Sequence, residues 1–179
     1  MSKYYRLIVF CLIGVLLSCG LTSSCSSQLK AKDRHLVHRF EYGKTAYIGP
    51  DGLAQAPPHA PKQVKWMVEA ANSLVGKPYV YGGGHRQFQD HGYDCSGAVS
   101  YVLRAGGKLE RPLVSQGFFE YGKKGYGDWV TIYVRDGHVF MTIAGLRFDT
   151  GGTWNSTGPR WKPERRGLKG YYVRHPRGL

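Results

Sequence analysis

The sequence predicts an α+β domain in which a helix that carries a cysteine precedes an antiparallel β-sheet. Two stretches with helical spacing of apolar residues come first, around residues 61–76 and 95–106. From residue 128 onwards, β-branched and aromatic runs alternate with short turns. The chain has 179 residues, of which 42% are hydrophobic, so we expect one domain with a real core plus attached segments. The order of helices before strands is typical of the α+β class.

The first helix is predicted to begin at Pro61, which suits a helix start, and to stop at Gly76. The second begins at Cys95 and ends at Gly106, with Asp94 as its N-cap. Between the helices, the stretch "GKPYVYGGGH" is expected to be extended and then to bend. The apolar positions that define the two helical faces are Val64, Met67, Val68, Ala71 and Leu74 in the first and Val99, Val102 and Leu103 in the second.

Four strands are predicted after a short helical or irregular piece at residues 113–121. They comprise residues 128–134, 138–144, 146–150 and 170–173, with "RDG" as the first turn and Ala144-Gly145 as the second. The first three would form an antiparallel meander.

The N-terminus has the features of an export signal. Lys3 and Arg6 form a basic start, and the apolar run of residues 7–17 is too short to span a bilayer comfortably. "LLSC" resembles a bacterial lipobox, which makes Cys19 the expected lipidation site. Cys25 is the alternative, and an ordinary cleaved signal is another. We therefore expect a signal peptide at 1–18, a tether at 19–60 and the folded domain at 61–179, in a lipoprotein anchored to a membrane of the bacterial envelope. A small hairpin within residues 39–49 is also possible.

Only one of the four cysteines, Cys95, falls in the predicted domain, so the sequence provides no disulfide framework and no clustered zinc ligands. The first turn of a helix offers free backbone N–H groups and the positive end of the dipole, which favour a thiolate. Cys95 is therefore a candidate nucleophile, although a buried structural cysteine is common.

A thiolate that acts as a nucleophile needs a base, and His138 opens a strand directly after a turn. If Ala144-Gly145 is a two-residue loop, His138 faces Gly151, and Asp149 becomes its diagonal neighbour on the same face. A three-residue loop would place Thr150 there instead. A carboxylate can hold an imidazolium, so Asp149 is the better orienting group. Asp149 could also bond only to the turn that follows it.

The stretches "GKPYVYGGGH", "YDCSGAVSYVL" and "GHVFMTIAGLRFDT" together resemble the NlpC family of cell-wall cysteine peptidases, which has a papain-like core. The resemblance runs from about Pro61 to the C-terminus. It implies that Cys95 is the nucleophile, that His138 is the base, and that a polar residue on the next strand orients the ring. Many members have a histidine in that third position, where this sequence has "FDT".

By the same resemblance, Tyr79, Asp94 and Ser96 match the positions that line the pocket for the amino end of a peptidoglycan stem peptide. The implied reaction is hydrolysis of stem peptides, often between D-γ-glutamate and a diamino acid, with no cofactor and no metal. An amidase or acyltransferase on the same core, or a silent wall-binding lipoprotein, are the alternatives.

The formal charge of +13 suits an anionic partner without identifying it. No nucleic-acid-binding motif is present, so we expect no nucleic-acid partner, and we expect a monomer. The basic tail from Arg160 to Leu179 would contact an anionic polymer or lipid headgroups, or it would be a solvated edge strand protected by its charges, which we favour.

Overall fold

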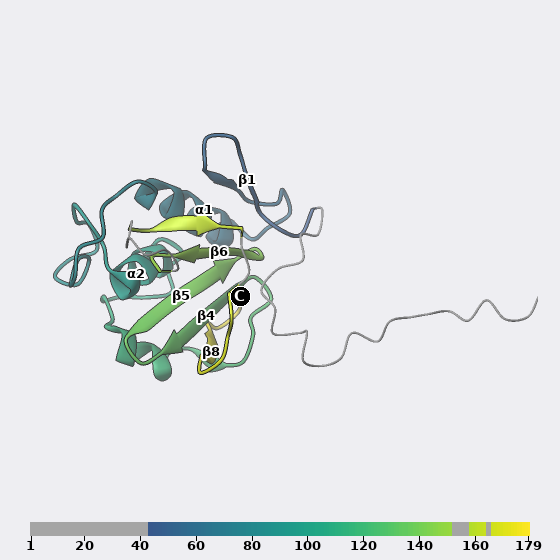
Figure 1. Cartoon of the computed structure of the whole chain (residues 1–179). Helices are drawn as coiled ribbons and strands as arrows, with labels where there is room; N and C mark the ends of the chain where they lie inside the picture. The colour runs from purple at the N-terminus through teal and green to yellow at the C-terminus, as the bar shows by residue number, and fades with distance from the viewer. Residues whose placement is uncertain (1–42, 152–157, 164–165) are drawn as a thin grey trace, which may run out of the picture. The chain divides into compact units, whose positions relative to one another are not determined.

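The computed structural model describes residues 43–151, 158–163 and 166–179, and these residues form an α+β fold (Figure 1). The predicted signal peptide, the candidate lipidation sites Cys19 and Cys25, and most of the predicted tether lie outside the described residues. No helix in the described ranges combines the length and the apolar character that crossing a membrane requires.

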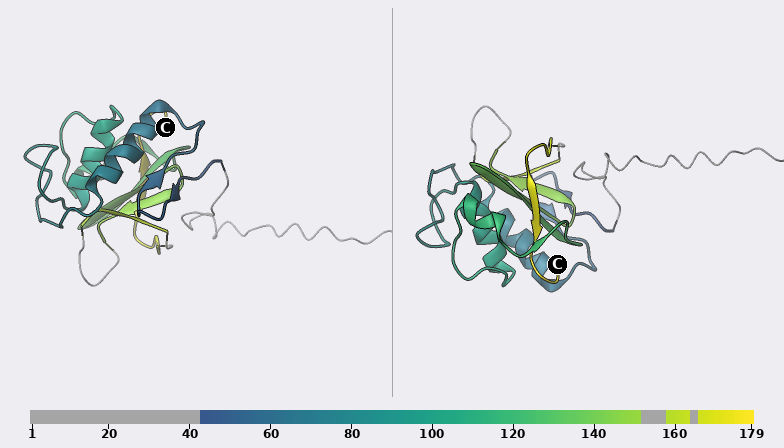
Figure 2. Two further views of the ribbon diagram at one scale, coloured as in Figure 1. Left: turned by 90° about the horizontal axis from the view of Figure 1, so that it is seen from above. Right: turned by 90° about the horizontal axis from the view of Figure 1, so that it is seen from below.

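Two α-helices lie together on one face of the sheet (Figure 2). Helix α1 spans Lys62–Leu74 and helix α2 spans Cys95–Ala105, close to the predicted bounds. The buried face of α1 consists of the five predicted residues from Val64 to Leu74. The main core joins this face to the apolar residues of α2 and to Val139, Met141 and Ile143 of the sheet.

The sheet has six antiparallel strands in the order β3-β8-β4-β5-β6-β7. Its central meander matches the prediction. The strand bounds are Lys123–Lys124 (β3), Val130–Arg135 (β4), His138–Ile143 (β5), Leu146–Asp149 (β6), Arg160–Lys162 (β7) and Tyr172–His175 (β8). A 3-10 helix, η2, spans Ser115–Phe119, within the piece predicted as helical or irregular.

The turn between β5 and β6 fixes the register on which the site depends. Ala144 and Gly145 both have positive φ angles, 44° and 80°, which is the conformation of a two-residue type I′ turn. Ile143 therefore pairs with Leu146, and Met141 pairs with Phe148. Of the two registers that the sequence left open, the two-residue loop is the one observed.

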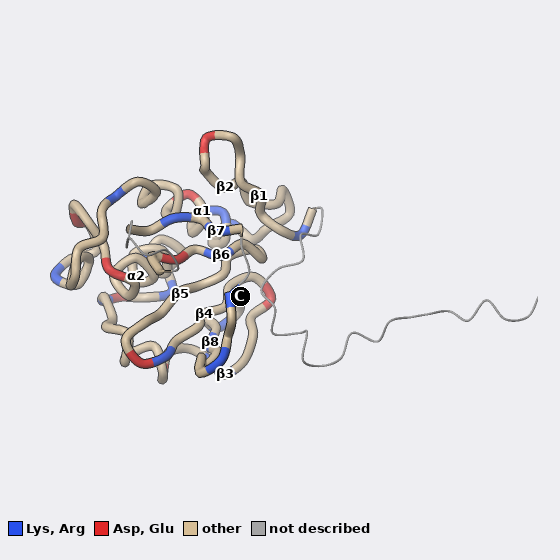
Figure 3. The backbone as a smooth tube through the Cα atoms, viewed as in Figure 1, with Lys and Arg blue, Asp and Glu red and all other residues tan. Residues whose placement is uncertain are grey.

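The basic tail agrees only in part with the edge strand that we favoured. β8 lies between β3 and β4, and Arg174 within it is buried. Lys and Arg are distributed along β3, β7 and β8 (Figure 3). β7 belongs to the same tail and was not predicted from the sequence; it forms the edge of the sheet opposite β3. The tail thus contributes an inner strand, β8, and an edge strand, β7, to the sheet.

A second, smaller cluster covers the other face of the sheet. Tyr133 and Phe140 are paired across β4 and β5, and their rings stack with centroids 4.7 Å apart. Tyr171 packs edge-on against Phe140, with centroids 5.2 Å apart. Leu168 and Val173 complete this cluster. The tail residues therefore seal the face of the sheet that the helices do not cover.

Part of the predicted tether also packs on the fold. β1 (Tyr47–Ile48) pairs with β2 (Ala54–Gln55), a hairpin that starts within the proposed stretch and ends beyond it. The side chain of Asn72 on α1 holds this hairpin, because it accepts from the Ala54 N–H and donates to the Ala54 carbonyl, both at 2.9 Å. The same amide oxygen accepts from the Trp161 indole on β7 at 2.7 Å.

Candidate active site

Cys95 is the first residue of α2, where the sequence predicted it, and only 9% of its surface is exposed. Asp94 caps the helix: its Oδ1 accepts from the Gly97 N–H at 2.7 Å. This bond satisfies one of the free donors of the first turn and fixes the direction in which the helix leaves the preceding loop. The thiol is the one free cysteine in the described residues.

The start of α2 packs directly on the backbone of the glycine-rich bend. A Cβ added to Gly97 would lie 2.0 Å from the carbonyl oxygen of Gly83 and 3.1 Å from the Cα of Gly84. Only glycine permits this approach. Two hydrogen bonds extend the contact: the Asp94 N–H donates to the Gly83 carbonyl, and the Gly82 N–H donates to the Asp94 carboxylate. The bend therefore holds Cys95 in a fixed place.

His138 and Asp149 are brought together as the two-residue turn requires. His138 is the first residue of β5 and Asp149 the last residue of β6, and the distance from His138 Nε2 to Asp149 Oδ1 is 3.0 Å. A carboxylate can only accept, so Nε2 carries the proton in this contact. Asp149 also accepts from the Gly151 N–H at 2.8 Å, so it bonds to its own turn as well as to the ring. Thr150, the alternative, is also buried, but the ring bonds to Asp149.

The thiol of Cys95 also interacts with the His138 ring. Burial lowers the pKa of His138, but hydrogen bonds to Asp149 and Cys95 and their negative charges outweigh it, so the pKa lies above its ordinary value. Burial raises the pKa of Asp149, and the hydrogen bond and charge of His138 together with the charge of Arg166 reverse this, so the pKa is lowered. The environment thus favours a charged imidazole between a carboxylate and a thiol.

Tyr79 lies close enough to Cys95 and Asp94 for their charges to act on its phenol. It bridges to Tyr93, the residue before the cap. Burial raises the pKa of Tyr79, and the charges of Cys95 and Asp94 raise it further. The phenol therefore stays protonated and is a hydrogen-bond donor next to the nucleophile.

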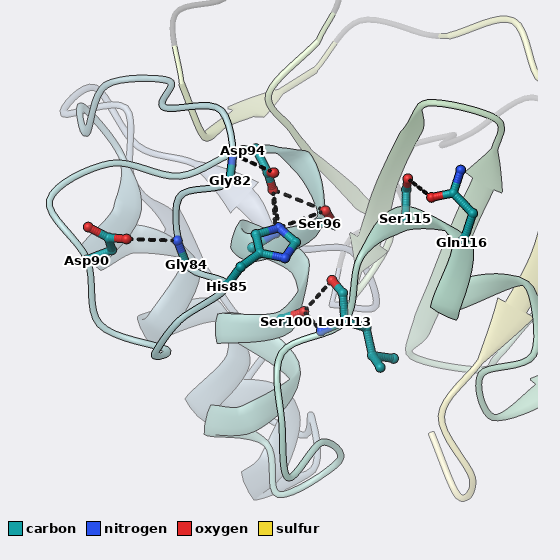
Figure 4. Close-up of polar contacts among 11 residues, drawn as sticks. Gly82, Gly84, His85, Asp90, Asp94, Ser96, Ser100, Leu113, Ser115 and Gln116 are labelled. Atoms are coloured by element: carbon teal, nitrogen blue, oxygen red, sulfur yellow. Dashed lines mark hydrogen bonds and ion pairs between the residues drawn. The ribbon is translucent and has the colours of Figure 1, made fainter.

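Asp94 and Ser96 meet a third residue that sequence reasoning did not select. His85 Nε2 lies 3.0 Å from Asp94 Oδ1 and 3.1 Å from Ser96 Oγ, and Ser96 Oγ donates to Asp94 Oδ1 at 3.1 Å (Figure 4). His85 comes from the glycine-rich bend. The position of His85 at the end of this bend, shortly before "DCSG", could have pointed to it. The chain has seven histidines, however, and nothing else in the sequence distinguishes His85 from the others.

The arrangement is suited to acyl transfer. It brings together a thiol at a helix start, an imidazole that interacts with this thiol and a carboxylate that bonds to the imidazole, which are the groups that thiol-dependent acyl transfer uses. In the described ranges, no group of three or more His, Cys, Asp or Glu side chains has the geometry to hold a metal ion.

Comparison with known proteins supports the fold. A solved structure of an NlpC/P60 family protein from Bacillus cereus ATCC 10987 is similar, with a TM-score of 0.50 and 18% sequence identity. The match covers 63% of this chain and 40% of that chain, so this chain corresponds to less than half of that protein's length. No family model matches the chain, and the comparison with curated proteins gave no match. The predicted α+β, papain-like fold is confirmed.

Proposed function

We propose that this chain is an NlpC-type cysteine peptidase that hydrolyses amide bonds in peptidoglycan stem peptides. The observation that carries the proposal is the ring of His138, which bonds to Asp149 through Nε2 and interacts with Cys95. A structural cysteine has no need of a histidine that a buried carboxylate orients. The bond between D-γ-glutamate and the diamino acid is the proposed scissile bond.

In the proposed reaction, the Cys95 thiolate attacks the amide carbonyl and forms a C–S bond. The imidazolium of His138 gives its proton to the amide nitrogen, and the C–N bond breaks as the amine leaves. Water then attacks the thioester while His138 takes a proton from it. The C–S bond breaks, which releases the carboxylic acid and restores the Cys95 thiolate and the His138 imidazolium. Backbone N–H groups at the start of α2, including that of Cys95, are the proposed donors to the oxyanion.

Tyr79, Asp94 and Ser96 are the proposed residues for the amino end of the stem peptide. What supports this is their position around Cys95 and the negative charge of Asp94, which attracts an ammonium group. His85 shares both partners and is therefore part of the same network.

The proposed setting is the bacterial envelope, with the chain exported and anchored by a lipid on Cys19. The predicted signal at 1–18 and the lipobox-like "LLSC" support this setting. Several acyl chains would be needed for stable anchoring, because a single chain binds a membrane only marginally.

The test is digestion of purified muropeptides by the full-length chain, with the products identified by mass spectrometry. Cys95→Ala is the matched inactive control. A cut between D-γ-glutamate and the diamino acid that is lost in the variant would support the endopeptidase. An intact released stem peptide would instead establish the amidase, which the same cysteine and histidine can perform. No product from several wall chemotypes would contradict hydrolysis and leave wall binding.

A further inference from the structure

The carboxylate that orients His138 is held from its other side by a residue of the basic tail. Arg166 Nη1 donates to Asp149 Oδ2 at 2.8 Å, while His138 and Gly151 donate to Oδ1. The two oxygens of Asp149 thus have separate partners. No role could be predicted for Arg166 from the sequence, because it lies 17 residues after Asp149 in a stretch without hydrophobic periodicity.

The guanidinium of Arg166 is itself fixed by aromatic rings. It lies 5.3 Å from the ring centroid of Phe140 on β5 and 5.7 Å from that of Tyr171. Such cation–π contacts restrict a long side chain and favour arginine over lysine. Its side chain is 17% exposed, whereas that of Asp149 is 0% exposed. Arg166 is therefore a packed component of the site rather than a surface charge.

A buried carboxylate needs such a partner. An unpaired charge inside a protein is strongly disfavoured, so a carboxylate with one free oxygen would turn toward water or take up a proton. Either change would release the ring of His138. The next cation, Arg147, has its Nε 3.9 Å from Asp149 Oδ2, which is beyond hydrogen-bond distance.

Packing around Gly151 couples the same groups. A Cβ at Gly151 would lie 3.0 Å from His138 Cε1 and 3.3 Å from Arg166 Nη1. The ring and the guanidinium therefore both rest against the backbone that follows Asp149, and neither moves without affecting the other.

We propose that Arg166 is a positioning residue for the cysteine–histidine pair: it fixes the carboxylate of Asp149, and through it the orientation of the His138 ring toward Cys95. This role rests on the proposed function for its meaning in catalysis, but it is testable without substrate. Where many members of the family have a histidine in the third position, this chain has Asp149, and Arg166 of the basic tail holds it in place.

The test is the pH dependence of alkylation of Cys95 by iodoacetamide in the full-length chain. We would compare the wild type with Arg166→Gln and Arg166→Lys. Arg177→Gln is the matched control, because Arg177 is an exposed arginine of the same tail and is not among the ion-pair partners of Asp149. Thermal unfolding of each variant, followed by circular dichroism, shows whether it is folded at the assay temperature.

If Arg166→Gln releases the ring, the imidazolium of His138 no longer stabilises the Cys95 thiolate. Loss of an opposite charge beside an ionised group lowers the population of that group about tenfold or more, so alkylation of Cys95 in Arg166→Gln should be ~10-fold slower than in the wild type between pH 5 and 6. Arg166→Lys should be intermediate, and Arg177→Gln should match the wild type. If the profile of a folded Arg166→Gln superposes on that of the wild type, the positioning role is wrong. If alkylation depends on Arg166 while the wild type digests no muropeptide, the positioning role stands and the proposed hydrolysis falls.

Discussion

Replacement of Gly97 by alanine should displace the start of α2 and with it Cys95. The added Cβ would lie 2.0 Å from Gly83 O, 3.0 Å from Gly83 C and 3.1 Å from Gly84 Cα. All three atoms belong to the backbone, so no side-chain rotation relieves the clash. Overpacking costs about 1–3 kcal/mol and more where the backbone must move, against which better helix propensity returns at most ~1 kcal/mol.

We therefore expect Gly97→Ala to lose ~2 kcal/mol or more of unfolding free energy, which for a domain of this size lowers Tm by roughly 6 °C. Thermal unfolding by circular dichroism measures this shift. The control is Gly167→Ala, since nothing lies within 4 Å of a Cβ there and its φ is not positive. Hydrolysis by Gly97→Ala should also fall, because the nucleophile moves. A Gly97→Ala protein with the wild-type Tm and full activity would refute the close packing of α2 on the glycine-rich bend.

Two further substitutions test the orienting carboxylate and the hairpin anchor. In Asp149→Asn, the pKa of His138 loses a group that raises it, so the basic limb of the pH–rate profile should move down by ~1 pH unit; an unmoved limb would contradict the assignment. Because the folded-state pKa of Asp149 is lowered, its contribution to stability is present above the unfolded pKa of 3.8 and is lost as the pH falls through the folded value. Urea unfolding between pH 2 and 6 should accordingly show a shallower acid loss in Asp149→Asn than in the wild type. Asn72→Ala leaves the peptide groups of Ala54 and the indole N–H of Trp161 without their partner, and should lower the free energy of unfolding by about 1–3 kcal/mol in urea titration; no loss would show that this bridge is unimportant.

Neighbouring residues in the sequence were sufficient to predict helix α2, which begins at Cys95. Asp94, Cys95 and Gly97 are neighbours in sequence, and capping depends only on residues within one turn. The contact between His138 and Asp149 was also predictable, because a two-residue turn fixes which residues of adjacent strands share a face. At the cap of α2 and at the turn between β5 and β6, the interacting residues are close in sequence and the backbone has a regular capping or turn geometry.

Residues that meet across the fold were not predictable in this way. Arg166 reaches Asp149 only because the chain passes through β7 before returning over Phe140. β7 itself is three residues long and carries two charges, so it has neither the length nor the alternation that signals a strand. Asn72 appeared as one polar position on a helix, although its amide joins the hairpin to the sheet.

The departure "FDT" illustrates how a local pattern can mislead about a site. By the family resemblance, the absence of a histidine in the third position weakened the expectation of catalysis. In the structure, the carboxylate in "FDT" is buried, bonds to His138 and is supported by a distant cation. Asp149 is thus an acceptor that can orient the ring, and Arg166 supports it from a distant part of the chain.

The central claim is that Cys95 becomes covalently linked to the acyl part of a stem peptide. The most direct measurement is the intact mass of the full-length chain after brief incubation with muropeptides and acid quenching, followed by peptide mapping. The account predicts an added mass equal to the acyl fragment, located on Cys95 and absent from Cys95→Ala. Turnover of muropeptides by Cys95→Ala, or an adduct located on another residue, would contradict the account.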